Sequence, residues 1–159
     1  MLATSQERSG DAGQSKRQEN GVIMSQALIV PMASHVALVT FLYALLTLAR
    51  APVVWSIGRK PDGSNPWAAV EHRISANLSN QFEWPLFFHA ACIVMLHLQP
   101  SPAAIALAWV FVAGRLLHSA VQILTENIRL RGVVFTVNFL AVLGLWVLVV
   151  VAAGTSPVA

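Results

Sequence analysis

The chain has 159 residues, of which 56% are hydrophobic and 11% are charged, and its formal net charge is +3. The apolar residues fall in runs long enough to cross a bilayer, so the composition excludes an ordinary soluble domain and predicts an integral membrane protein. A single cysteine excludes an internal disulfide and paired thiol ligands for a metal. The basic residues are spread over segments that flank the apolar runs, and no basic stripe with interleaved aromatic residues appears, which argues against a nucleic-acid partner.

The sequence divides into a polar N-terminal segment and an apolar remainder. Residues 1–24 are predicted to be a disordered tail, because up to Gly21 they contain scarcely an apolar side chain. The alternative is that translation begins at Met24, directly before the first apolar run. Residues 25–159 are predicted to form an all-α domain of four transmembrane helices. The predicted spans are residues 27–49, 74–98, 102–124 and 132–153, each close to the ~20 residues that a ~30 Å hydrocarbon layer requires.

Lysine and arginine are concentrated in two of the three connections between these spans, which we call loops 1 and 3. The basic residues there are Arg50, Arg59, Lys60 and Arg73 in loop 1, and Arg129 and Arg131 in loop 3. The second connection and the C-terminal segment contain none. Because basic loops stay in the cytoplasm, we expect loops 1 and 3 on the cytoplasmic side and both termini outside.

Polar side chains form one stripe on each of the two middle spans. The stripes, at ~100° per residue, consist of Arg73, Asn77, Asn80 and Glu83, and of Arg115, His118, Gln122 and Glu126. A charged side chain at membrane depth is expected to have a partner, to lie in a hydrated cavity or to take part in the function. Counted at ~1.5 Å per residue from the cytoplasmic ends, Glu83 and Arg115 both lie roughly 13 Å deep, so we expect them to be partners.

A purely structural role is the main alternative for these residues. Glu83 and Arg115 would then neutralise each other and fix the register of two helices, which is at least as well supported as ligand contact. For His118, a hydrogen-bonded core histidine is the more common role than a general base, and one histidine is too few for a metal site. Three further histidines are assigned no role: His35, His89 and His97.

Short motifs follow one another along the two middle spans. They are Asn80-Gln81-Phe82-Glu83-Trp84-Pro85, Arg115-Leu116-Leu117-His118 and Thr125-Glu126-Asn127, followed by Arg131. Their order and spacing resemble the MAPEG family, the membrane-associated proteins in eicosanoid and glutathione metabolism, and look most like its bacterial branch. The resemblance therefore implies a location in a bacterial inner membrane. The resemblance covers all four spans. It implies a four-helix bundle assembled as a homotrimer, with glutathione bound between neighbouring subunits near the cytoplasmic face.

The resemblance also implies roles for individual residues. The positions that match the glutathione site are Asn80, Glu83, Arg115, His118, Arg73 and Arg50, the last two by a looser alignment of the loop. Arg131 matches the catalytic end of the site. Because glutathione has two carboxylates and a thiol that reacts as the thiolate, positive charge at these positions is physically reasonable.

Four positions depart from the eicosanoid-forming members of that family. Ser79 stands in place of an arginine and Gln122 in place of a tyrosine, which weakens the hold on the peptide carboxylates. Gly132 and Phe135 stand in place of a serine and a tyrosine, so two hydroxyls that could face the thiol are absent. Stabilisation of the thiolate would therefore rest mainly on Arg131.

Two functions of different classes fit these observations. One is a weak glutathione-dependent transferase or peroxidase that acts on an apolar electrophile from the bilayer. The other is a non-catalytic lipid-binding or scaffold protein of the same fold, since a fold does not guarantee turnover. A proton-coupled transporter is disfavoured, because no internal repeat is visible. The expected partners are a lipophilic small molecule, membrane lipid and further copies of the chain.

Overall fold

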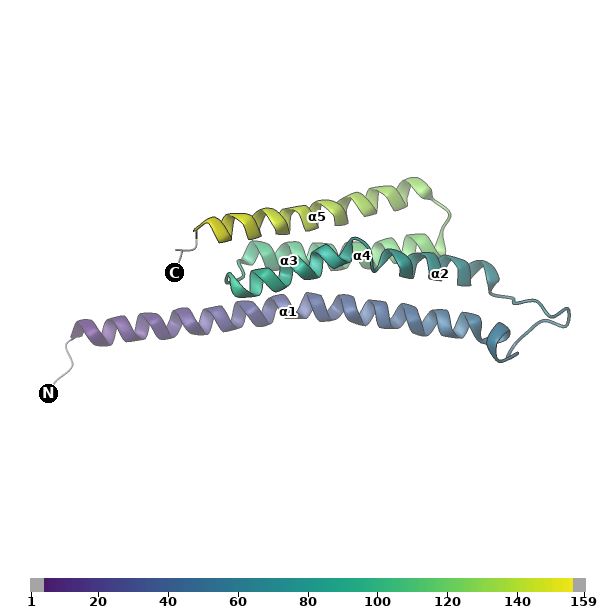
Figure 1. The fold of residues 1–159 in the computed structure, drawn as a ribbon, viewed down its shortest axis with the longest axis horizontal. Coiled ribbons are helices and arrows are strands. Elements are labelled where there is room, and N and C mark those ends of the chain that lie inside the picture. Colours follow the sequence, from purple (N-terminus) through teal and green to yellow (C-terminus); the bar gives the residue numbers. More distant parts are fainter. Residues whose placement is uncertain (1–4, 156–159) are drawn as a thin grey trace.

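The structure, a computed structural model, describes residues 5–155, with side chains described from residue 13 onwards. This part of the chain is helical and contains five helices: α1 Ser5–Val54, α2 Ala68–Asn80, α3 Pro85–His97, α4 Pro102–Leu124 and α5 Ile128–Thr155. Figure 1 shows an elongated bundle in which α2 and α3 follow each other along one rod. The chain therefore runs along the bundle four times, which confirms the predicted four-helix architecture.

Helix α1 is longer than the span predicted within it. It has 50 residues, about 75 Å at ~1.5 Å per residue, and its N-terminal part projects beyond the other helices (Figure 1). The structure thus has helix from Ser5 where a disordered tail over residues 1–24 was predicted; residues 1–4 lie outside the described part. Once the apolar turns have formed, each further residue adds a hydrogen bond without the cost of a new nucleus, and no proline precedes Pro31 in α1.

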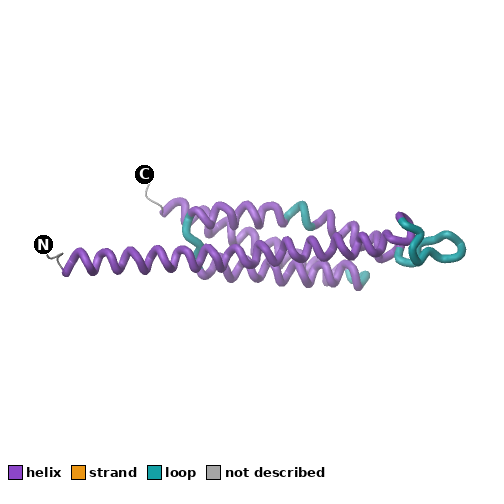
Figure 2. Tube along the Cα trace, turned by 90° about the horizontal axis from the view of Figure 1, so that it is seen from below, coloured by secondary structure: helices purple, strands orange, loops and turns teal. Residues whose placement is uncertain are grey.

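Among the described residues, three helical segments are long and apolar enough to cross a membrane, and they contain the first, third and fourth predicted spans: Gly13–Val54, Pro102–Leu124 and Ile128–Thr155. The second predicted span, residues 74–98, is not one continuous helix. Figure 2 shows a short loop between α2 and α3. The break precedes Pro85, because proline has no N–H to donate and its ring collides with the carbonyl one turn earlier.

The outward faces of the helices are apolar. Large hydrophobic side chains at least half exposed occur along every helix that has the length to cross a membrane, among them Phe41, Leu48, Leu116, Leu140 and Val150. In water such a surface would drive aggregation, whereas lipid covers it without loss of free energy. The chain is therefore an integral membrane protein.

Two apolar clusters inside the bundle are separated by a layer of buried polar side chains. One cluster is built around Phe88 and Phe111, whose rings stack with centroids 4.0 Å apart. Along α1, His35 lies between Leu28 of this cluster and Leu42 of the other. We call this layer the polar layer, and its members are His35, Asn77, Gln81, Arg115, Ser119 and Gln122.

Loops 1 and 3 lie at the same end of the bundle (Figure 1). Side-chain hydrogen bonds fasten loop 1 to the end of α1: Arg59 Nε donates to the Pro52 carbonyl at 3.0 Å, and Asn65 Nδ2 donates to the Ala49 carbonyl at 3.0 Å. The two basic loops can therefore face the same side of a membrane, as the distribution of lysine and arginine requires.

Candidate functional site

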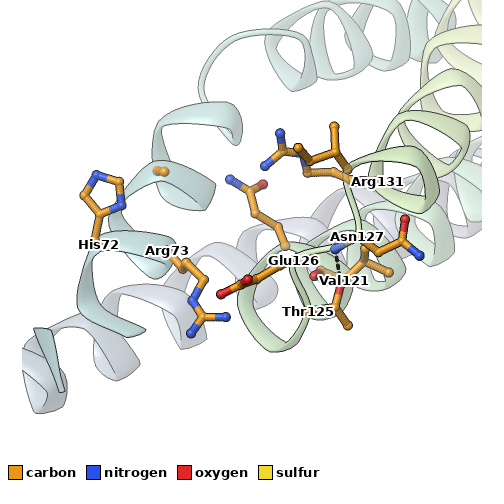
Figure 3. A pocket seen from close by; sticks show the side chains of 10 residues that line it. His72, Arg73, Val121, Thr125, Glu126, Asn127 and Arg131 are labelled. Carbon is orange, nitrogen blue, oxygen red and sulfur yellow. Dashed lines mark hydrogen bonds between the residues drawn. The ribbon is translucent and has the colours of Figure 1, made fainter. Parts of the chain in front are cut away.

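A groove opens at the end of the bundle where loops 1 and 3 lie. It is formed by α2, the last turn of α4 and the start of α5, and its volume is about 280 Å³. Its lining includes the charged side chains of Arg73, Glu126 and Arg131, the amide of Gln122 and the ring of His72. Figure 3 shows Arg131 directed into the groove and Arg73 and Glu126 converging at its mouth. The structure thus brings together two of the arginines that the sequence suggested.

The turn between α4 and α5 places Arg131 at the groove. At the end of α4, Thr125 Oγ1 donates a hydrogen bond to the Val121 carbonyl at 2.7 Å. Asn127 Oδ1 then accepts a hydrogen bond from the Leu130 backbone N–H at 3.0 Å, which caps the N-terminus of α5. Arg131 therefore belongs to the first turn of α5, opposite α2.

The groove carries positive charge that the chain does not neutralise. Within residues 13–155 the one ion pair joins Arg50 Nε to Glu71 Oε1 at 2.9 Å, and neither residue lines the groove. Arg73 and Arg131 are therefore without an ion-pair partner in this part of the chain, and Glu126 adds a single negative charge. Guanidinium groups bind anionic groups such as carboxylates through charge-assisted hydrogen bonds, so the groove is suited to a ligand with more than one anionic group.

Arg115, another predicted site residue, lies inside the bundle and not in the groove. Its side chain is 0% exposed. Nε donates to Gln81 Oε1 at 3.0 Å, and Nη2 donates to the Asn80 carbonyl at 2.8 Å. Asn80 is the last residue of α2, so its carbonyl would lack a helical partner, and Arg115 supplies the donor. Arg115 thus stabilises the break between α2 and α3.

Glu83 does not form the predicted ion pair with Arg115 within the chain. It lies in the break, its side chain is exposed, and it has no ion-pair partner among the side chains that the structure describes. The expected pairing assumed one continuous helix through residues 74–98. The break before Pro85 removes that geometry, and Gln81 takes the position next to the guanidinium group.

Arg115 also fixes the orientation of the amides in the polar layer. Because its Nε donates to Gln81 Oε1, the other end of that amide, Nε2, is left to donate to Asn77 Oδ1 at 3.2 Å. Asn77 Nδ2 in turn donates to Gln122 Oε1 at 3.0 Å, and Asn80 Nδ2 donates to the same oxygen at 3.2 Å. Gln122 lines the groove, so the layer presents an amide N–H donor there.

The same series of hydrogen bonds continues in the other direction to two histidines. His35 Nε2 lies 3.1 Å from Gln81 Oε1, and since a carbonyl oxygen only accepts, His35 is the donor. His35 Nδ1 lies 3.1 Å from His89 Nε2. From His35 through Gln81 and Asn77 to Gln122, every donor therefore points the same way, an arrangement in which the bonds polarise one another. We call this series, together with His89, the hydrogen-bond chain.

Two buried polar side chains stand apart from the hydrogen-bond chain. His118 on α4 is 3% exposed and Asn138 on α5 is 0% exposed. Neither ring nitrogen of His118 and neither amide atom of Asn138 has a hydrogen-bond partner within the described part of the chain. Asn138 packs against Gly114, where a side chain would collide with its amide. His118 does not line the groove, so its predicted place at the ligand site stays a prediction.

Three members of the hydrogen-bond chain were missed by sequence reasoning: His35, Gln81 and His89. Gln81 falls outside the polar stripe predicted on a continuous second span. His35 lies on the first span and His89 on the second, so neither belongs to the stripe on the third span. A usable signal existed, because ionisable side chains inside spans usually face the bundle interior and find partners there. His35 and His89 are such side chains.

The fold and these residues define an integral membrane helical bundle with a basic groove at one end. The sequence model of the MAPEG family matches residues 28–151. The match covers most of the chain, which belongs to the MAPEG family. No curated protein and no solved structure matches the chain.

Proposed function

We propose that the protein is a glutathione-dependent transferase or peroxidase acting on an apolar electrophile that arrives through the bilayer. The groove supports this most directly, because Arg73 and Arg131 stand there without ion-pair partners among the described residues. Glutathione carries two carboxylates, one ammonium group and a thiol that reacts as the thiolate. Arg73 is suited to a carboxylate, the Glu126 carboxylate to the ammonium group, and Arg131 to the thiolate. The Gln122 amide adds a neutral donor. Family membership favours the same ligand.

Arg131 would act on the thiol of bound glutathione. A guanidinium group beside the sulfur favours the thiolate, which is the nucleophile, while the thiol proton passes to water. The sulfur then forms a bond to the electrophilic carbon, and the leaving group departs with its bonding electrons. Gly132 and Phe135 offer no hydroxyl next to Arg131, so we expect modest rates.

The test is conjugation of 1-chloro-2,4-dinitrobenzene by the full chain in lipid nanodiscs. Arg131→Ala should lower kcat by about 10²-fold, the scale found when one preorganised donor is removed, with a smaller effect on glutathione affinity. Arg129→Ala is the matched control, because Arg129 is exposed in the same helical turn and does not line the groove. A wild-type rate equal to the uncatalysed rate, or equal losses in both variants, would contradict the proposal.

The second candidate is a non-catalytic lipid-binding or scaffold protein. It is favoured by the internal bonding of Asn80 and Arg115, which hold the helices together and do not reach the groove. Such a protein would show no glutathione-dependent turnover, and Arg131→Ala would change assembly or membrane orientation only. Turnover that is lost in Arg131→Ala with the assembly intact would exclude this candidate.

The assembly and location we propose are a homotrimer in a bacterial inner membrane with loops 1 and 3 in the cytoplasm. The basic end of the bundle and the positive-inside rule support the orientation. The groove is open on the outside of a single chain, so a neighbouring copy has room to close it. Native mass spectrometry from nanodiscs should show three copies, and a monomer would contradict the assembly.

A further inference from the structure

A second cavity lies between α1 and the break that separates α2 from α3. Its volume is about 170 Å³, and none of its lining residues is shared with the groove. The side chains at its apolar mouth are more than half exposed: Val36 56%, Phe82 58% and Leu86 64%. Its polar wall consists of His35, Gln81 and His89. Because it opens on an apolar face of the bundle, we call it the membrane cavity.

The polar wall of the membrane cavity ends in a hydrogen-bond acceptor. Gln81 Oε1 accepts from both Arg115 Nε and His35 Nε2. A second cation next to the buried guanidinium group would be strongly unfavourable, so His35 is neutral and its Nδ1 is an acceptor. His89 must then donate from Nε2. In a neutral His89 the remaining nitrogen, Nδ1, carries a lone pair, and it has no hydrogen-bond partner among the described residues.

We propose that the membrane cavity binds an apolar molecule bearing a hydroxyl group, which donates its hydrogen bond to His89 Nδ1. The exposed apolar mouth admits a ligand dissolved in the lipid, and the apolar walls bind its hydrocarbon part. An ether or ester has no proton to donate. A carboxylate would lose its hydration and find no free cation, because Arg115 is fully buried behind Gln81. A phenol or a long-chain alcohol meets all of these conditions.

The hydrogen-bond chain adds to this selectivity. A hydroxyl group that donates to His89 Nδ1 extends the chain by one bond in the same direction, so it is strengthened by the bonds behind it. A ligand that presents only an acceptor would face the lone pair and be repelled. This inference does not depend on glutathione binding, since the groove and the membrane cavity have separate linings.

Two matched probes test the proposal on the wild-type chain in lipid nanodiscs. 1-Naphthol has the hydroxyl donor, and 1-methoxynaphthalene has the same ring system without it. Fluorescence titration, corrected with empty nanodiscs, should show saturable binding of 1-naphthol at one site per chain. The methoxy compound should bind at least tenfold more weakly. If both probes only partition into the nanodisc without saturation, the proposal is overturned. The same result is expected if another copy of the chain covers the cavity.

Variants assign that binding to the cavity. His89→Phe keeps a ring but removes the acceptor, so the preference for 1-naphthol should disappear. His97→Phe, on the same helix but exposed and outside the cavity, should keep the preference. Leu86→Trp fills the mouth and should abolish binding of both probes, whereas Leu140→Trp on α5 should not. Retained preference in His89→Phe, or unchanged binding in Leu86→Trp, would overturn the proposal.

Discussion

Replacing Arg115 with methionine should lower the free energy of unfolding by about 2–4 kcal/mol. Methionine preserves length and apolar contact but removes the donors to Gln81 Oε1 and the Asn80 carbonyl. Hydrogen bonds from charged donors contribute ~1.5–3 kcal/mol each, and relief from burying a cation offsets part of the loss. Gln81→Met leaves Arg115 Nε unpaired in the interior. The double variant contains neither the guanidinium group nor the Gln81 amide, so neither is left in the interior without the other. Its loss of unfolding free energy should therefore be about 1–3 kcal/mol smaller than the sum of the two single losses.

The measurement is a double-mutant cycle by SDS titration in mixed micelles, followed by tryptophan fluorescence and helical circular dichroism. Lys60→Gln is the control, because Lys60 is exposed in loop 1 and shares no hydrogen-bond partner with Arg115. Its effect should add to that of Arg115→Met within ~0.5 kcal/mol. Additive losses for Arg115 and Gln81 would refute the assignment of Gln81 as the partner.

Three further predictions follow from packing and charge. Gly114→Ala places a methyl group against the Asn138 amide and should lower the free energy of unfolding by about 1–3 kcal/mol, whereas Gly132→Ala meets open space on a helix and should raise it by ~1 kcal/mol. Asn138→Leu removes a buried amide without partners and should raise the free energy of unfolding by ~1–3 kcal/mol in the same titration; a loss would show that the amide is bonded. Reporter fusions after Gln99 and after Ala159 should both read as external, and a cytoplasmic signal from either would contradict the topology.

Local signals made the apolar helices predictable. Helix α4 begins and ends where the sequence indicated, because Ser101 caps it by accepting a hydrogen bond from the Ala104 N–H and Pro102 suits the first helical position. The break before Pro85 was harder to predict. Transmembrane helices often contain proline as a kink, and whether the helix separates depends on groups elsewhere that satisfy the freed carbonyls. Here that group is Arg115, which is distant in sequence.

The sequence predicted the charged residues of the candidate site but not the contacts between helices. Arg73 and Arg131 follow from the basic loops, and both line the groove. The partner of Arg115 was inferred from depth along an unbroken helix, and the break changed which side chain faces it. The direction of the hydrogen-bond chain depends on side-chain rotamers in α1, α2, α3, α4 and the break between α2 and α3, and hydrophobic periodicity carries no information about rotamers. His35 and His89 could be assigned a role only from the structure, which places their ring nitrogens within hydrogen-bond distance.

Isothermal titration calorimetry of glutathione against the full chain in nanodiscs tests the central claim, that the groove holds this tripeptide. We predict saturable binding to the wild type and binding about tenfold weaker in Arg73→Ala, since that change removes one of the two unpaired guanidinium groups. Lys60→Ala, which changes an exposed cation of loop 1 outside the groove, should leave the affinity unchanged. The absence of binding heat in the wild type, or equal weakening in both variants, would contradict the account.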